Sequence, residues 1–451
     1  MNRRRLLAAL LLAAGVLAAF HRVYWRPFDN TGQESVASFH AYGFAAASAV
    51  GLWPDPVVAR DIDIGHSRIK PYPHWPNAFF LLFEAVLRVF GRTEAVGRSF
   101  AILGTLLGFL LTIVSLKRND LLLYLSLPLL LLSSAGRDSV PFVFADVALY
   151  FWIGALLWIT AHLAGRRHYN LIFRAAMLAA LCSNHLIAPY AAVVVFLKWR
   201  ESGSARDLLA DLAFLGAGGL AVLLMLAASV GSLPAGLAEL RNVFAIRSQQ
   251  QGWFRELEWE LRESLYLGPA SIWLVAAAWL VVFAGRQWRT AILLPSFLLF
   301  TLLLREYVIA HHFARLPFVF FSLVTLLVAV ELALERLAGR RSWGRLWPAA
   351  RVVMALLFAA RLSFSPRQYG PDPMVSATRR ALYRIVDAPE NRAALARCNA
   401  FDFAHYEHHV NPYDRIGQFF FGRQVVERVR SGAPIRRCWV DLENETVRGD
   451  P

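Results

Sequence analysis

Long apolar stretches separated by short basic or polar connections run through most of the sequence. The apolar stretches cover residues 6–20, 99–116, 121–135, 140–163, 171–181, 186–197, 212–230, 269–284, 291–304, 316–334 and 349–362. A helix needs roughly 20 residues to cross the hydrocarbon core of a bilayer, and shorter stretches cross where the membrane or the helix ends adjust. The pattern therefore predicts an all-α polytopic membrane protein with about eleven transmembrane helices.

Basic residues predict the orientation of these helices. Every second connection is rich in Lys and Arg, and the connections between them hold far fewer; the basic group includes Arg3–Arg5, Lys117, Arg118, Arg166, Arg167, Lys198, Arg200, Arg286, Arg289, Arg340 and Arg341. Positive connections stay in the cytoplasm. We therefore expect a cytoplasmic N-terminus and an extracytoplasmic tail in a bacterial-type inner membrane. This pattern also explains the net charge of +15 without a nucleic-acid partner. The first apolar stretch resembles a signal peptide but lacks a clear small-residue cleavage site, which favours an uncleaved span.

The predicted outer face holds all the long connections. The first outside loop, residues 23–98, contains two apolar segments, 35–50 and 79–90, that are expected to be helices lying in the membrane interface. The loop 231–268 contains an amphipathic helix in which Phe254, Leu257, Leu261 and Leu265 face away from a polar side that includes Glu260. A third loop covers 305–317. The chain is thus divided into a transmembrane domain, 1–362, and a small soluble domain, 363–451. Cys398 and Cys438 of the latter are placed to form a disulfide in an oxidising compartment.

Polar islands beside the membrane carry the candidate chemistry, because no soluble-enzyme motif is present. One island, residues 26–34, follows the first apolar stretch and contains Asp29 and Glu34. Another, residues 70–77, reads Lys-Pro-Tyr-Pro-His-Trp-Pro-Asn. Ionisable groups at a membrane are costly and usually functional.

The layout resembles the GT-C superfamily of membrane glycosyltransferases, of the protein-mannosyltransferase and aminoarabinose-transferase type. The run 80–106, FLLFEAVLRVFGRTEAVGRSFAILGTL, is similar to the family phrase LxxLxFKLFGxSExAxRLxSxLxGLL, and residues 72–76 look like the family's Pro-rich turn. The resemblance is good over roughly the first 120 residues and looser afterwards. One departure concerns the acidic motif: Gln33-Glu34 lies where the family has Asp-Glu, and Asp29-Asn30 is the alternative alignment.

The resemblance implies a GT-C-like fold and transfer of a sugar from a polyprenyl-phosphate donor to a lipid, glycan or protein acceptor on the outer face. Glu34 or Asp29 would position or deprotonate the acceptor. Cations at headgroup depth would bind the donor phosphate; the candidates are Lys70, His74, Arg305, His311, His312 and Arg315. Tyr72, Asp138, Asp146 and Tyr307 are expected to line the cavity.

Simpler interpretations of these residues stay open. Glu34 and Asp29 also suit a helix start or a turn, and Asp138 or Asp146 could instead pair with Arg137. The cofactor is unknown; a divalent cation could be held by Glu34, His74 or His311, although no spacing fits a specific metal signature. The rival hypothesis is a non-catalytic polytopic membrane protein, a transporter or envelope-glycan assembly factor, that keeps the fold. The altered acidic motif favours the rival, whereas the absence of two related halves with broken spans argues against a transporter.

Overall fold

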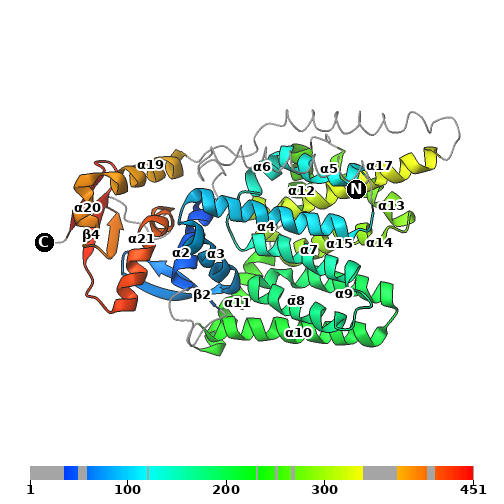
Figure 1. Cartoon of the computed structure of the whole chain (residues 1–451), viewed down its shortest axis with the longest axis horizontal. Helices are drawn as coiled ribbons and strands as arrows, with labels where there is room; N and C mark the ends of the chain where they lie inside the picture. Colours follow the sequence, from blue (N-terminus) through cyan, green and yellow to red (C-terminus); the bar gives the residue numbers. More distant parts are fainter. Residues whose placement is uncertain are drawn as a thin grey trace.

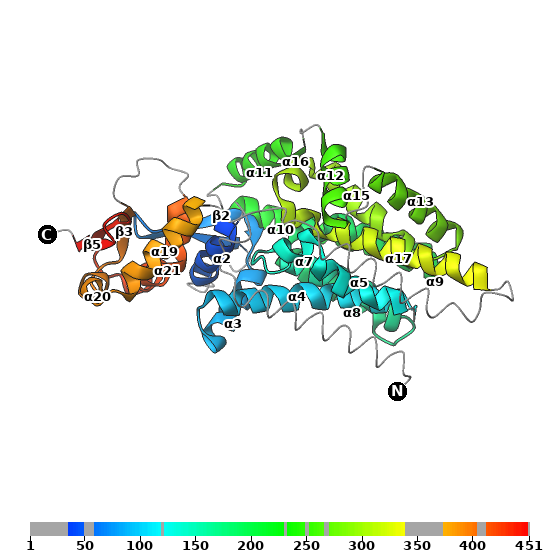
Figure 2. The same ribbon diagram turned by 90° about the horizontal axis from the view of Figure 1, so that it is seen from above.

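The computed structural model describes residues 35–48, 58–118, 121–229, 232–248, 252–265, 270–338, 373–403 and 412–449, and the statements below concern these residues. Apolar helices run roughly along the long axis of the molecule, and the tail lies beyond one end of them (Figure 1). The first-loop segments lie between the helices and the tail, which is also seen from above (Figure 2). The long helices of this bundle are α4 (Glu94–Ser115), α5 (Leu121–Leu132), α7 (Asp146–His162), α8 (Tyr169–Ser183), α9 (Ala188–Ser202), α10 (Ala205–Ala228), α13 (Ser271–Ala284), α15 (Leu293–Leu303) and α17 (Leu316–Ala338).

Short helices connect the long ones. They are α6 (Ser134–Ser139), η2 (His185–Ile187), α14 (Trp288–Ala291), α16 (Arg305–Ala310) and η3 (His312–Arg315). The loop 231–268 folds into α11 (Leu233–Ser248) and α12 (Trp253–Leu265). Helix α12 buries Leu257, Leu261 and Leu265 as its spacing predicts, but Glu260 is buried as well. Glu260 was predicted on the polar side; it is buried because Arg315 lies 3.3 Å from its carboxylate and supplies a compensating charge.

The predicted count of eleven spans is not confirmed. Among the described residues, three helices are long and apolar enough to cross a membrane, namely α4, α10 and Phe313–Arg336. Five more are apolar but shorter: Leu123–Leu132, Asp146–His162, Tyr169–Ser183, Ser271–Ala284 and Trp288–Leu303. The predicted spans 6–20 and 349–362 lie outside the described residues.

Helices α4 and α7 approach each other so closely that their backbones touch. A Cβ atom on Gly154 would overlap the carbonyl oxygen of Gly108, and one on Gly108 would overlap the backbone of Tyr150. Small residues allow such close packing, which supplies most of the association energy between helices where no water is available to be expelled. The end of this pair at which α7 begins lies beside the candidate site.

The first outside loop contains helices at both predicted places, together with a hairpin that was not predicted. Helices α2 (Ser35–Ser48) and α3 (Ala78–Phe90) flank the antiparallel strands β1 (Val58–Asp63) and β2 (Arg68–Pro76). The Pro-rich segment was predicted as a turn, but it forms a strand. Proline is tolerated in this strand because a two-stranded ribbon leaves an edge on which no N–H is needed.

The tail combines helices with a small sheet, so the prediction of an all-α fold is wrong here. Its elements are α19 (Pro373–Asp387), α20 (Pro389–Leu395), β3 (Ala400–Phe403), α21 (Pro412–Ser431), β4 (Arg437–Asp441) and β5 (Thr446–Gly449). The sheet order is β3-β4-β5, with β3 parallel and β5 antiparallel to β4. Cys398 and Cys438 form the expected disulfide across the start of the parallel pair.

The tail packs directly on the first outside loop. The amide of Phe401 in β3 donates to the carbonyl of Ile64 at the hairpin tip at 3.0 Å. Helix α2 is buried against α21, β1 and α3, and its residues from Ser38 to Ser48 are all buried. Helix α2 was expected to lie in the membrane interface; instead it is a core helix, since every face of it has a protein neighbour.

Candidate functional site

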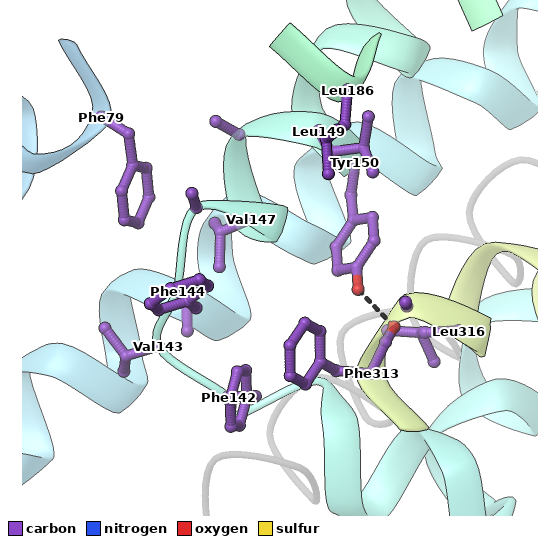
Figure 3. Packing of buried hydrophobic residues seen from close by; sticks show 14 of the residues in the cluster. Phe79, Phe142, Val143, Phe144, Val147, Leu149, Tyr150, Leu186, Phe313 and Leu316 are labelled. Carbon is purple, nitrogen blue, oxygen red and sulfur yellow. Dashed lines mark hydrogen bonds between the residues drawn. The ribbon is translucent and has the colours of Figure 1, made fainter. Parts of the chain in front are cut away.

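The segment 140–145, between α6 and α7, lies where several parts of the chain meet (Figure 3). The ring of Phe142 stacks on Phe313 with centroids 4.2 Å apart, and Phe144 packs edge-on against Trp75 at 5.2 Å. The hydroxyl of Tyr150 donates to the carbonyl of Phe313 at 2.6 Å, which ties α7 to the loop before α17. This packing fixes the start of α7, whose first residue is Asp146.

Asp146 is the first residue of α7 and is buried. The hydroxyl of Tyr307 donates a 2.8 Å hydrogen bond to its carboxylate, Oδ2, across 161 residues of sequence. The N-terminus of a helix favours a negative charge because its free N–H groups point toward it. On the other side, the side-chain amide of Asn184 donates to the carbonyl of Ala145 at 3.0 Å. Asp146 and Tyr307, both predicted to line a cavity, are therefore brought into direct contact.

Two histidines and a tryptophan lie around this pair. Trp75 of β2 packs against the rings of His185 and Tyr307, at 5.9 and 6.3 Å between centroids. His311 packs on Tyr307 at 4.8 Å and on Phe313 at 5.1 Å. We call this group, Trp75, Asp146, His185, Tyr307 and His311, the junction cluster. It joins the first outside loop, the start of α7, the α8–α9 connection and the late loop.

The predicted phosphate-binding cations are not equivalent. Arg305 begins α16 next to the junction cluster and is half-buried. Arg315 is buried and pairs with Glu256 and Glu260 of α12, each at 3.3 Å. Lys70 is exposed and lies 3.8 Å from the carboxylate of Asp61. Carboxylates engage Arg315 and Lys70. Arg305 begins the short helix that carries Tyr307, and His311 packs on Tyr307.

The remaining predicted residues lie elsewhere or outside the described part. Tyr72 packs on Phe44 of α2 at 4.9 Å, on the side of the hairpin near the tail. Asp138 is buried in α6. Asp29, Glu34 and the side chains of His74 and His312 lie outside the described residues. Helix α2 nevertheless begins directly after Glu34, and the hydroxyl of Ser38 in its first turn accepts from the amide of Val143 at 3.2 Å.

Sequence reasoning missed a second polar group, formed by Asp61 with His40 and Gln418. Nε2 of His40 lies 2.8 Å from Oδ1 of Asp61, and the amide of Gln418 in α21 donates to the same oxygen at 3.1 Å. Alternation in the stretch 59–64, with Asp61 and Asp63 on one face, was the only available signal. We call this group the hairpin–tail lock, because it ties α2, β1 and α21 together.

In the hairpin–tail lock, Asp61 is ionised and His40 is neutral at pH 7. Burial lowers the pKa of His40 below its ordinary value of 6.5, outweighing the hydrogen bond and charge of Asp61 that act the other way. For Asp61, burial alone would raise the pKa, but the hydrogen bond and charge of His40, together with Lys70 and Gln418, hold it below its ordinary value. The group therefore carries one buried negative charge at neutral pH.

Metal ligands do not gather in the described part of the chain, where no group of three or more His, Cys, Asp or Glu side chains could hold an ion.

Comparison with known proteins identifies the fold. No family model matches the sequence, and no curated protein matches it. The structure is similar to the crystal structure of the oligosaccharyltransferase of Archaeoglobus fulgidus in the apo form, with a TM-score of 0.52 and 12% identity. The match covers 92% of this chain and 64% of that one, so the chain spans less than two thirds of its neighbour. The complex of that protein with Zn and sulfate matches at a TM-score of 0.48 and 12% identity, covering 92% and 61% of the two chains. The likeness confirms the predicted GT-C fold.

Proposed function

We propose that this chain is a membrane glycosyltransferase that moves a sugar from a polyprenyl-phosphate donor to a lipid, glycan or protein acceptor on the outer face. The observation that carries the proposal is the junction cluster, in which a buried carboxylate, two histidines and two aromatic rings from separate loops meet at one end of the apolar helices. Polar groups gathered this way at a membrane are expensive unless they act on a substrate. The GT-C fold is the one in which this chemistry is expected.

The carboxylate that activates the acceptor substrate in this proposal is Glu34, with Asp29 as the alternative. Consecutive Cα atoms are about 3.8 Å apart, so Glu34 cannot be far from Ser35, the first residue of α2. The contact between Ser38 and Val143 holds that end of α2 against the segment leading into Asp146. Glu34 would accept the acceptor's proton or orient its nucleophile, and Asp146, held by Tyr307, would supply a second, fixed carboxylate at the start of α7.

The donor's phosphate is assigned to Arg305 and His311. The leaving group is a lipid phosphate, whose charge needs a cation at the depth where it develops. Arg305 is permanently charged and presents several donors, and His311 lies against Tyr307. Apolar helices facing the bilayer would hold the lipid tail.

Charge-removing variants of equal shape test the assignment. Glu34→Gln and Asp29→Asn would be assayed in proteoliposomes with a panel of radiolabelled polyprenyl-phosphate sugars. One of the two should lose transfer activity by about 10²–10⁴-fold, the usual contribution of a general base, with normal insertion and yield. Glu427→Gln, the same change on the exposed face of α21, is the matched control and should keep full activity. Full activity in both test variants would refute the acceptor assignment.

The rival function is a non-catalytic envelope-glycan factor that keeps the fold. The specific observation in its favour is Gln33-Glu34 in place of the family's Asp-Glu. It predicts that the donor binds, with weaker binding in Arg305→Gln, while the parent transfers no sugar from any donor of the panel.

A further inference from the structure

A basic hollow lies in the tail, away from the junction cluster. Its volume is about 810 Å³, and Arg397, Arg436, Arg437, Ile435, Ala394, Gly449 and the Cys398–Cys438 disulfide line it. Three of these lining residues are arginines and none is acidic. Arginine is always charged at physiological pH, so the described lining of the hollow is electropositive and attracts anions. We call this feature the tail hollow.

The arginines of the hollow differ in how far they are already neutralised. The guanidinium of Arg437 lies 3.3 Å from the carboxylate of Asp402 and is partly balanced. The Nε of Arg397 donates to the backbone carbonyl of Ala393 at 3.0 Å, which positions the side chain without cancelling its charge. Arg397 and Arg436 therefore supply most of the attraction for an anion.

The backbone beneath the hollow is fixed, which suits a binding site more than a passive surface. The amide of Asn399 donates to the carbonyl of Arg436 at 2.9 Å, and the amide of Arg436 donates back to the Asn399 side chain at 2.8 Å. The disulfide closes the same point. A site whose frame is already ordered loses less entropy on binding.

The position of the hollow argues for a water-soluble ligand and against a lipid. Helix α20 and strand β4 lie at the end of the long axis farthest from the apolar helices (Figures 1 and 2). Trp439 follows the lining residue Cys438 in β4; it lies on the same face of the strand as Arg437 and is 44% exposed. An exposed indole beside guanidinium groups offers a flat apolar surface for a sugar ring and charges for its acidic substituent.

We propose that the tail hollow binds an acidic glycan through its carboxylate or phosphate groups. Arg397 and Arg436 hold the anionic group, and Trp439 packs against the adjoining sugar. This site goes beyond the transfer reaction and does not depend on it, since binding here is measured without any turnover.

Binding to the full-length protein in nanodiscs of zwitterionic lipid tests the proposal. The probe is hexagalacturonate, with maltohexaose as the neutral glycan of equal length. Hexagalacturonate should bind saturably, at least 10-fold more tightly than maltohexaose, and should weaken as salt rises. Each charge-assisted hydrogen bond is worth about 1.5 kcal/mol or more, roughly a 10-fold change in affinity. The pair Arg397→Gln/Arg436→Gln should therefore bind roughly 30-fold or more weakly, after allowance for solvent screening.

Matched variants and a chemical probe keep the test decisive. Arg380→Gln/Arg430→Gln removes the same charge from exposed tail positions outside the hollow and should leave affinity unchanged. If the test pair does not fold, the unsubstituted protein still gives a readout. Hexagalacturonate should protect its Arg436 from modification by phenylglyoxal, and maltohexaose should not. Equal affinity in test and control pairs, no protection, or binding only to nanodiscs of phosphatidylglycerol would each overturn the proposal, the last in favour of a membrane surface.

Discussion

The apolar bundle and the outer part of the molecule are held together by different kinds of contact. In the bundle, α4 and α7 pack backbone to backbone through Gly108 and Gly154. In the outer part, the tail is attached through directional polar contacts, such as Arg379 with Glu94 at 2.6 Å and Asp61 with Gln418 at 3.1 Å. The α4–α7 contact therefore depends on shape, while the attachment of the tail depends on charge.

The division matters for function because the junction cluster sits where the two kinds of packing meet. Its carboxylate, Asp146, is placed by close helix packing, whereas Trp75 comes from the hairpin that the tail holds in place. Loosening the tail should move Trp75 and leave Asp146 where it is.

Substitution of Gly154 by Val should be the most damaging single change. The added carbons would overlap the carbonyl oxygen of Gly108, which is backbone and cannot rotate away. We expect a loss of more than about 3 kcal/mol, beyond the usual cost of overpacking, seen as loss of monodisperse protein in detergent. Gly216→Val places the same side chain in open space on α10 and should keep the parent's yield. Normal recovery of both variants would disprove backbone packing between α4 and α7.

Removal of the disulfide should weaken the tail while leaving the bundle intact. Closing a loop of this length, with its cysteines 40 residues apart, stabilises by roughly 3–4 kcal/mol in the chain-entropy model. Cys398→Ser/Cys438→Ser should therefore increase hydrogen exchange in β3, β4 and α20, and exchange in α4 and α7 should stay as in the parent. Cys182→Ser, which alters the free cysteine among the described residues, is the control. Equal exchange in the tail of all three proteins would contradict the expectation.

Acidification should release the hairpin–tail lock. The pKa values of His40 and Asp61 are both lowered by folding. The unfolded chain therefore binds more protons than the folded chain at each group, and the folded state loses stability as the pH is lowered. The contribution of His40 is complete above about pH 6.5 and is lost as pH falls through its folded pKa. That of Asp61 is lost below its ordinary value of 3.8. The melting temperature of the tail should therefore fall between pH 7.5 and pH 5.5.

Variants separate the two groups of the lock. His40→Gln keeps a donor without a titrating ring and should abolish most of the change between pH 7.5 and pH 5.5. Asp61→Ala leaves the imidazole without its acceptor and Gln418 with only the carbonyl of Ile62, and should cost about 2 kcal/mol at neutral pH. A pH profile of His40→Gln that matches the parent would show that the lock does not titrate in this range.

The two regions also differ in how well the sequence predicts them. Hydrophobic runs located each long helix described in the bundle, because helices in a membrane must satisfy their own hydrogen bonds and so follow the apolar pattern; short helices such as α16 were predicted as loop. The hairpin was missed because its prolines favour a turn. Helix α2 was expected in the membrane interface because its apolar composition does not show that α21 packs against it. Asp146 and Tyr307 were both predicted to line the cavity, and the structure brings them into contact; their role as cavity-lining residues stays a prediction.

The hairpin–tail lock could not be predicted, for a physical reason. His40 and Asp61 are 21 residues apart, and Gln418 is 357 residues from Asp61. No local periodicity links positions that only tertiary packing brings together. The pairing of Arg315 with α12 escaped prediction in the same way, since Glu260 reads as part of a solvated face until the arginine opposite it is known.

The smallest expected effect concerns Lys70, which lies at the edge of the lock. Its ammonium group is 3.8 Å from Asp61, and its side chain is 52% exposed. Exposed ion pairs contribute roughly 0–1 kcal/mol and are screened by salt. Lys70→Met should therefore lower the melting temperature by no more than a few degrees at low ionic strength, and by less at 0.5 M salt. Arg68→Met, which removes a similarly exposed partner of Asp63, is the comparison. If Lys70→Met instead matched Asp61→Ala, Lys70 would be essential to the lock, and the attachment of the tail would rest on a three-group ion network rather than on the buried hydrogen bonds.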